Sequence, residues 1–147
     1  MKFLHCADLH LSQKEKEYSL SVLEEIVHIA AKEHSTLVFA GDTFDSFEDL
    51  EILRSEFRKQ IGSLKTEILF IPGNHERLKI GKRSIKNLDL GNLVCADTSP
   101  QVHTVEDTEF LLIPFMDNYN AYREWDLPEK TKACRVAVIH GSVSSMT

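Results

Sequence analysis

Four short apolar runs, each closed by a turn that carries Asp, Asn or His, constrain the fold more than any other feature. The runs cover residues 2–7, 36–40, 67–71 and 134–139. Short apolar runs bounded by polar and turn-forming residues are typical of buried strands. Open α/β sheets bind their ligands at the carboxyl ends of such strands. We therefore expect the four strands to bring their polar turns together at one edge of one sheet.

The segments between these runs predict an α/β fold. Apolar residues recur at helical spacing in 18–34 and in 48–63, so each should form an amphipathic helix. Strand–helix–strand units of this length imply parallel pairing with a right-handed crossover. Residues 93–95 predict a further parallel strand, and residues 101–105 with 109–115 predict an antiparallel hairpin.

Length and composition favour a globular protein with a single domain over residues 1–147. The chain is 42% hydrophobic and 27% charged, which is ordinary for such a domain. No apolar run approaches the roughly 20 residues that span a bilayer, and the N-terminus lacks the length of a signal peptide. We expect a cytoplasmic protein without a membrane partner.

The charge distribution gives a mixed indication about nucleic acid. The net charge is −6, whereas a self-sufficient nucleic-acid surface usually carries a basic patch. Lys79, Lys82, Arg83 and Lys86 do cluster shortly after the run at 67–71. Such a cluster is more often a solvated helix face, yet here it would border the polar turns.

The residues at the strand ends are those of a two-metal site: Asp8, His10, Asp42, Asn74 and His140. Their oxygen and imidazole donors suit Mn²⁺, Fe or Zn²⁺ better than Ca²⁺. Asp8 and His10 are two residues apart, so on an extended segment they face the same side and can hold one ion. Asn74 and His140 would hold the second ion. Asp42, at the tip of the middle strand, is the predicted bridge.

Charge explains why a bridge is needed. Two divalent ions about 3.5–4 Å apart repel each other unless an anion lies between them. Two aspartates offset only part of the positive charge, and the remainder would attract hydroxide and an anionic substrate such as a phosphate ester. A metal-bound hydroxide, formed from a water whose pKa is lowered towards about 7, would be the nucleophile.

Three neighbouring residues receive supporting roles. His75 follows Asn74 and is predicted to act as a general acid or to neutralise charge on the leaving oxygen. Glu76 would orient the His75 imidazole and raise its pKa. Asp45 is predicted to support the site from outside the metal ligands.

Each motif has an ordinary alternative when it is considered alone. An Asp-x-His pair is usually part of a surface loop, and Gly-Asp or Asn-His after a strand is often turn chemistry. A single histidine after an apolar strand is usually a packed core residue. Because the motifs occur at four strand ends, the metal site is the stronger interpretation.

The motif set resembles that of the calcineurin-like metallophosphoesterases. The matching motifs are Asp8-x-His10, Gly41-Asp42-x-x-Asp45, Gly73-Asn74-His75-Glu76 and the late His140. The opening run from Phe3 to Leu11 is most similar to the SbcD-type DNA-repair exonuclease branch.

This resemblance implies a four-layer α/β/β/α sandwich and a dinuclear, commonly Mn²⁺-dependent, phosphodiesterase that acts on DNA. It assigns Asp8, His10 and Asp42 to one metal ion. It assigns Asp42, Asn74 and His140 to the other, and His75 to the leaving group. It also implies a homodimer and an ATPase partner of the structural-maintenance type.

The chain departs from the family pattern at its end. The family closes its site with a Gly-His-x-His motif beyond the position of His140, and this chain ends seven residues after His140. We therefore expect the N-terminal part of a longer protein, with a sandwich incomplete at the C-terminus and one ligand missing from each ion. Two alternatives stay open: a general phosphodiesterase or phosphomonoesterase, and a non-catalytic scaffold or binding module that retains the fold.

Overall fold

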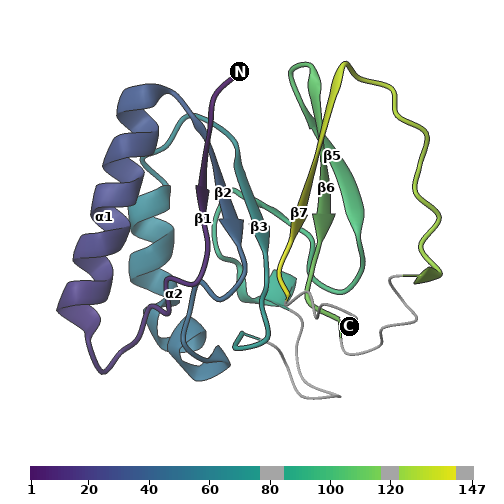
Figure 1. The fold of residues 1–147 in the computed structure, drawn as a ribbon. Coiled ribbons are helices and arrows are strands. Elements are labelled where there is room, and N and C mark those ends of the chain that lie inside the picture. The colour runs from purple at the N-terminus through teal and green to yellow at the C-terminus, as the bar shows by residue number, and fades with distance from the viewer. Residues whose placement is uncertain (77–84, 117–122, 142–147) are drawn as a thin grey trace, which may run out of the picture.

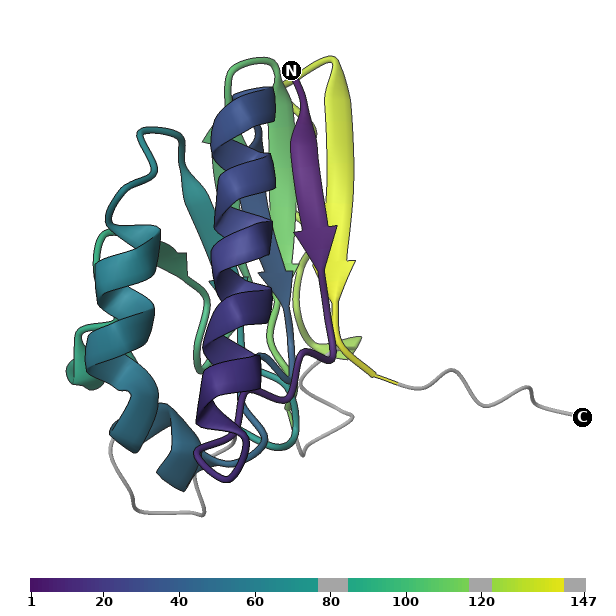
Figure 2. The ribbon, with the colours of Figure 1, turned by 90° about the vertical axis from the view of Figure 1, so that its left-hand side faces the viewer.

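The computed structural model describes residues 1–76, 85–116 and 123–141. These residues form three layers, namely a pair of helices, a parallel sheet and a second sheet (Figure 1). Both helices cover the same face of the first sheet (Figure 2). The α/β class is confirmed, and the described residues build three layers of the expected four.

The first sheet contains four parallel strands in the order β1-β2-β3-β4. Their bounds are Phe3–Cys6, Thr36–Ala40, Ile68–Ile71 and Val94–Cys95. Every residue of β2 and β3 is buried, because helices cover one face and the second sheet covers the other. This two-sided burial explains why β3 is entirely apolar and why β2 is apolar after Thr36.

Three helical segments accompany this sheet. They are α1 (Lys16–Glu33), α2 (Phe47–Ile61) and the short 3-10 helix η1 (Ile85–Leu88). Ser46 caps α2, since its hydroxyl accepts a hydrogen bond from the Asp49 backbone N–H at 3.0 Å. The chain therefore enters α2 only one residue after Asp45, which places the polar loop after β2 directly against the start of a helix.

The second sheet contains β5 (Gln101–Val105), β6 (Thr108–Ile113) and β7 (Cys134–Ile139) in that order. β5 and β6 form the predicted antiparallel hairpin. The prediction that all four polar strand ends share one sheet is wrong for β7, because β7 pairs parallel with β6. An apolar run specifies a strand but not its neighbour. Since the carboxyl ends of β1, β2, β3 and β7 point the same way (Figure 1), their turns still meet.

Two hydrophobic cores hold the layers together. Phe39 and Phe70 face the helices, where Phe39 contacts Phe57 with ring centroids 5.5 Å apart. Val38 and Leu69, from the same two strands, pack instead against the second sheet. Alternate side chains of one strand therefore enter different cores.

Two expectations from the sequence concern surfaces. Among the described residues, no helix is long and apolar enough to cross a membrane. The predicted basic cluster falls largely outside the described part of the chain, which contains neither Lys79 nor Lys82 nor Arg83.

Candidate metal centre

The loops after β1 and β2 continue the parallel pairing of their strands. The backbone N–H of Asp8 donates to the Gly41 carbonyl at 3.1 Å, and that of His10 donates to the Asp42 carbonyl at 3.0 Å. These hydrogen bonds keep the Asp8–His10 segment beside Asp42. Three predicted ligands are thus adjacent because the strands that carry them are adjacent.

The same three residues have an unusual backbone conformation. Asp8, His10 and Asp42 have φ angles of 54°, 49° and 48°. This left-handed conformation costs a non-glycine residue on the order of 1–2 kcal/mol, although Asp tolerates it better than most. Strained backbone persists where the surrounding structure imposes it, and it concentrates at functional sites.

Two glycines allow the loops to approach one another closely. A Cβ at Gly41, whose φ is 93°, would lie 2.3 Å from Cγ of His140. A Cβ at Gly73 would lie 2.0 Å from Oδ1 of Asp42. Sequence reasoning treated both glycines as ordinary turn residues and did not assign them this role. Their signal was the repeated Gly-Asp and Gly-Asn order at strand ends.

Asp42 lies at the centre of the site. Its side chain is only 5% exposed, and its Oδ1 accepts the His75 backbone N–H at 3.0 Å. Its Oδ2 lies 4.0 Å from Nε2 of His10, 3.9 Å from Nε2 of His75 and 3.3 Å from Nε2 of His140. Three imidazoles from three different strand ends therefore surround one carboxylate oxygen.

The other ring nitrogen of each histidine is held by an acceptor. Nδ1 of His140 lies 3.1 Å from the Ala40 carbonyl, and Nδ1 of His75 lies 2.8 Å from the Asp45 carbonyl. Nδ1 of His10 lies 3.0 Å from Oδ1 of Asp45. Carbonyl and ionised carboxylate oxygens only accept hydrogen bonds, so Nδ1 carries the proton in all three rings. In all three rings it is therefore Nε2 that faces the site.

This arrangement fits a bound cation. Nε2 of His140 lies 3.1 Å from Oδ1 of Asn74 and 3.3 Å from Oδ2 of Asp42, so three atoms with lone pairs converge there. Donor atoms of Asp8, His10 and Asp42 lie within 4.8 Å of one another. Mixed oxygen and imidazole donors suit transition metals. The structure therefore brings together all five predicted ligands, with Asp42 common to both groups.

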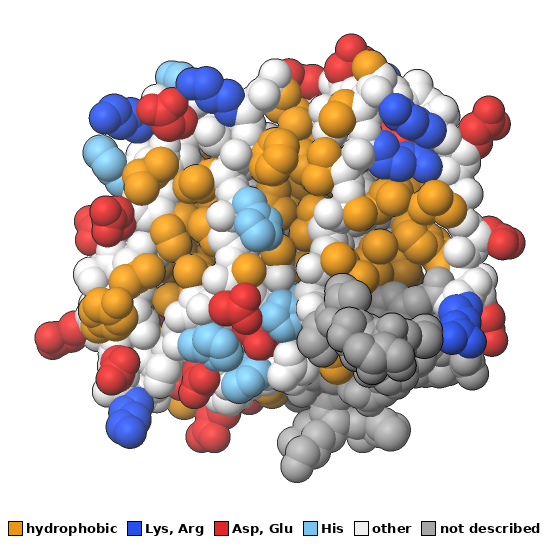
Figure 3. Space-filling view, in the orientation of Figure 1, with side chains coloured by type: hydrophobic (Ala, Val, Ile, Leu, Met, Phe, Trp, Pro, Cys, Tyr) orange, Lys and Arg blue, Asp and Glu red, His pale blue; other side chains and the backbone are white. Residues whose placement is uncertain are grey.

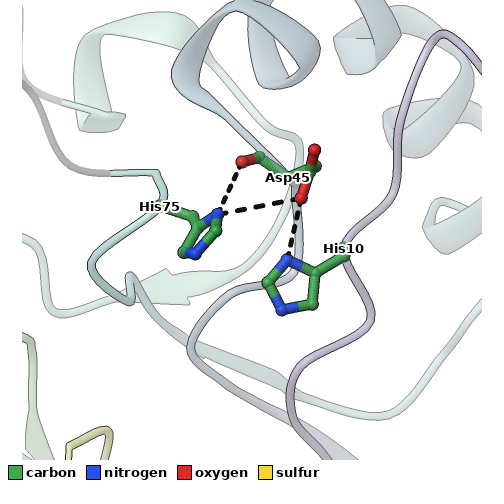
Figure 4. A group of neighbouring side chains, drawn as sticks. All are labelled: His10, Asp45 and His75. Atoms are coloured by element: carbon green, nitrogen blue, oxygen red, sulfur yellow. Dashed lines mark hydrogen bonds and ion pairs between the residues drawn. The ribbon is translucent and has the colours of Figure 1, made fainter.

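Asp45 lies between two of the histidines (Figure 4). Its Oδ1 is 3.0 Å from Nδ1 of His10 and 3.7 Å from Nδ1 of His75. His10, Asp45 and His75 also have donor atoms close enough to hold an ion. However, the Nδ1 atoms already donate to Asp45, and a carboxylate that accepts from one ring nitrogen typically orients a histidine whose other nitrogen binds metal. Asp45 therefore contacts both rings on the side away from Nε2, and its supporting role stays a prediction.

His75 is oriented differently from the prediction. Asp45, through its backbone carbonyl, accepts from Nδ1 and is the main cause of a His75 pKa above the ordinary value. The negative charges of Asp42, Asp45 and Glu76 raise this pKa further. The sequence prediction had given the orienting role to Glu76, and the structure gives it to a carbonyl 30 residues earlier in the chain.

Glu76 is instead buried beneath the loops, with no exposed surface. Its Oε1 accepts the Phe44 backbone N–H at 2.8 Å, and its Oε2 accepts the Gly73 backbone N–H at 2.9 Å. Burial raises the pKa of Glu76 to about 7, and the nearby charge of Asp42 contributes to the rise. Nothing in the local sequence distinguishes this role from the one predicted.

The site is open to solvent. His75 is 41% exposed and Asp45 is 52% exposed. Histidine and acidic side chains gather on the surface at the end of the molecule where β1, β2 and β7 terminate (Figure 3). Within the described part of the chain, the His75 imidazole is therefore accessible from solvent.

The chain is similar to one protein family and to solved structures. The family model for calcineurin-like phosphoesterases matches residues 1–145. No curated protein sequence matches the chain. Among solved structures, a crystal structure of a protein of unknown function from Aquifex aeolicus is similar, with a TM-score of 0.39 and 14% sequence identity. That alignment covers 82% of this chain and 67% of the other.

Proposed function

Because the chain belongs to the calcineurin-like phosphoesterase family, its general activity is metal-dependent phosphoester hydrolysis, and we propose that its substrate is DNA, cut as by an SbcD-type exonuclease. The observation that carries the hydrolase assignment is the ring of three Nε2 atoms around Oδ2 of Asp42. The choice of DNA is supported by the opening motif from Phe3 to Leu11 and by the open position of His75.

Two sets of ligands would hold the divalent ions, for which Mn²⁺ is our first choice and Fe or Zn²⁺ the alternatives. Asp8, His10 and Asp42 hold one ion, and Asp42, Asn74 and His140 hold the other. Ions bound there supply Lewis acidity to a phosphoryl oxygen and make a nucleophile available from water at neutral pH. Asp42 belongs to both sets because its buried Oδ2 lies 4.0 Å from Nε2 of His10 and 3.3 Å from Nε2 of His140.

His75 is the proposed general acid. Its raised pKa keeps the ring protonated to a higher pH than a free histidine. The hydrogen bond from Nδ1 to the Asp45 carbonyl fixes the ring, so Nε2 points towards the site. From there Nε2 donates its proton to the leaving oxygen as the phosphorus–oxygen bond breaks.

The test compares four substrates in the presence of Mn²⁺: linear duplex DNA, closed circular DNA, bis(p-nitrophenyl) phosphate and p-nitrophenyl phosphate. We expect linear DNA to be degraded, closed circular DNA to resist, and Asp42→Ala to be inactive. Hydrolysis of the small esters without DNA cleavage would instead indicate a general phosphoesterase. Mn²⁺ binding without hydrolysis of any substrate would indicate a binding module.

The proposal extends to location and partners. The resemblance to the SbcD branch suggests a cytoplasmic homodimer that works with an ATPase of the structural-maintenance type. Sedimentation velocity at micromolar concentration tests the dimer, and a sedimentation coefficient of a monomer across that range would contradict it.

A further inference from the structure

Two buried carboxylates connect the loop after β2 with the turn after β3. Asp42 belongs to the first of these segments and accepts, through Oδ1, the backbone N–H of His75 in the second. Glu76 belongs to the second segment and accepts, through Oε1, the backbone N–H of Phe44 in the first. Its Oε2 accepts the N–H of Gly73 within its own turn. The two contacts are therefore reciprocal.

We propose that Glu76 is a positioning residue, whose carboxylate sets the Asp42 loop against the Asn74–His75 turn so that both segments present their ligands to the same ions. This inference rests on the proposed function, because it assumes that Asp42 and Asn74 bind metal. Glu76 has no exposed surface, so it acts on the site through the two loops and not by touching substrate.

The need for such a contact follows from where the sheet ends. The pairing between β2 and β3 ends at Ala40 and Ile71, and the predicted ligands lie beyond that point. Past the ladder, the carboxylate contacts of Asp42 and Glu76 join the two segments. Asp42 and Asn74 would be poorly aligned without them, since backbone outside a ladder has more conformational freedom.

Close packing transmits the position of the turn to Asp42. Gly73 lies so near that a Cβ there would be 2.0 Å from Oδ1 of Asp42 and 2.5 Å from the Asp42 backbone nitrogen. Glu76 accepts directly from the Gly73 N–H. A shift in the Glu76 carboxylate therefore moves a residue that already touches the proposed bridging ligand.

Two substitutions disrupt the contacts of the Glu76 carboxylate in different ways. Glu76→Gln keeps the volume but replaces one accepting oxygen with an NH₂ group, so either Phe44 or Gly73 faces a donor instead of an acceptor. Glu76→Asp keeps the carboxyl group but shortens the side chain by one methylene, so it cannot reach both N–H groups.

Glu109→Gln is the matched control. Glu109 is also a buried glutamate, 2% exposed, and it also accepts a backbone N–H, from Thr131 at 2.9 Å. It lies near the amino end of β6, whereas the site lies at the carboxyl ends of the strands. The Glu109→Gln substitution removes a comparable buried carboxylate but leaves the loops of the site unchanged.

The experiment titrates the full chain with MnCl₂ by isothermal titration calorimetry, at a temperature where circular dichroism shows each variant to be folded. Losing a residue that orients metal ligands typically lowers metal affinity about 10–100-fold, and we expect this for Glu76→Gln and for Glu76→Asp. Glu109→Gln should bind Mn²⁺ as the wild type does. If Glu76→Gln does not fold, Glu76→Asp carries the comparison.

Wild-type affinity in a folded Glu76 variant would overturn the inference, as would an equal loss in Glu109→Gln. Failure of the wild type to bind Mn²⁺ would overturn the proposed function and this inference with it. Binding by the wild type and equally by the Glu76 variants would overturn the inference alone.

Discussion

Replacing Gly41 by alanine tests whether close packing of the loops creates the metal site. Gly41 has a φ of 93°, and its added Cβ would lie 2.3 Å from Cγ and from Nδ1 of His140. Carbon atoms in contact lie about 3.5–4.0 Å apart. The imidazole must therefore move by about 1 Å or more, which separates its Nδ1 from the Ala40 carbonyl and its Nε2 from Asp42.

The expected cost has two parts. A residue with a side chain in this backbone region costs on the order of 1–3 kcal/mol. The lost hydrogen bond from His140 to Ala40 adds about 1 kcal/mol. In addition, we expect Mn²⁺ affinity to fall at least about 10-fold, which corresponds to about 1.4 kcal/mol of binding free energy.

Gly91→Ala is the control that separates backbone strain from displacement of the His140 ring. Gly91 has a similar φ of 103°, but its added Cβ would meet the side chain of Arg58 at 3.1 Å, which is flexible and can move. Urea denaturation should show that both variants are destabilised, with Gly41→Ala lower by about the cost of the hydrogen bond. Calorimetric titration with MnCl₂ should show weakened binding in Gly41→Ala alone. Wild-type Mn²⁺ affinity in Gly41→Ala would refute the reasoning.

Three further predictions concern metal, pH and packing. Millimolar Mn²⁺ should raise the melting temperature of the wild type but not of Asp42→Ala in scanning fluorimetry, because a ligand stabilises the state that binds it; an unchanged wild-type curve would count against the site. Hydrogen bonds from Thr131, and secondarily from Arg135, lower the pKa of Glu109 from its ordinary 4.5 to about 2. The stability that ionised Glu109 contributes is therefore present above about pH 4.5 and lost as the pH falls towards 2. Urea titrations from pH 3 to 7 should therefore show a weaker acid dependence for Glu109→Gln, and equal slopes would contradict this. Phe57→Ala should cost about 3–5 kcal/mol of unfolding free energy, since Phe57 is fully buried; a loss below about 1 kcal/mol would show that the core relaxes around it.

The local sequence was sufficient for the elements and for the identity of the candidate ligands. Residues 37–40 and 68–71 are continuously apolar because both faces of β2 and β3 are buried, so their pattern alone indicates interior strands. The candidate ligands could be recognised because they directly follow these strands in the sequence. The donor atoms of carboxylate, amide and imidazole side chains follow from the residue type alone. The candidate ligands identified in this way lie together in the structure: Asp8, His10, Asp42, Asn74 and His140.

Only the tertiary structure decided how those side chains are held. β7 pairs with β6 in a second sheet, since the partner of an apolar strand depends on packing between distant segments. The ring of His75 is fixed by the backbone carbonyl of Asp45, and Glu76 by contrast binds the N–H groups of Phe44 and Gly73. Backbone carbonyl and N–H groups are nearly the same in every residue, so no sequence pattern marks which one a side chain will reach. The local sequence specifies which residues are candidate ligands, whereas their orientation is a property of the packed loops.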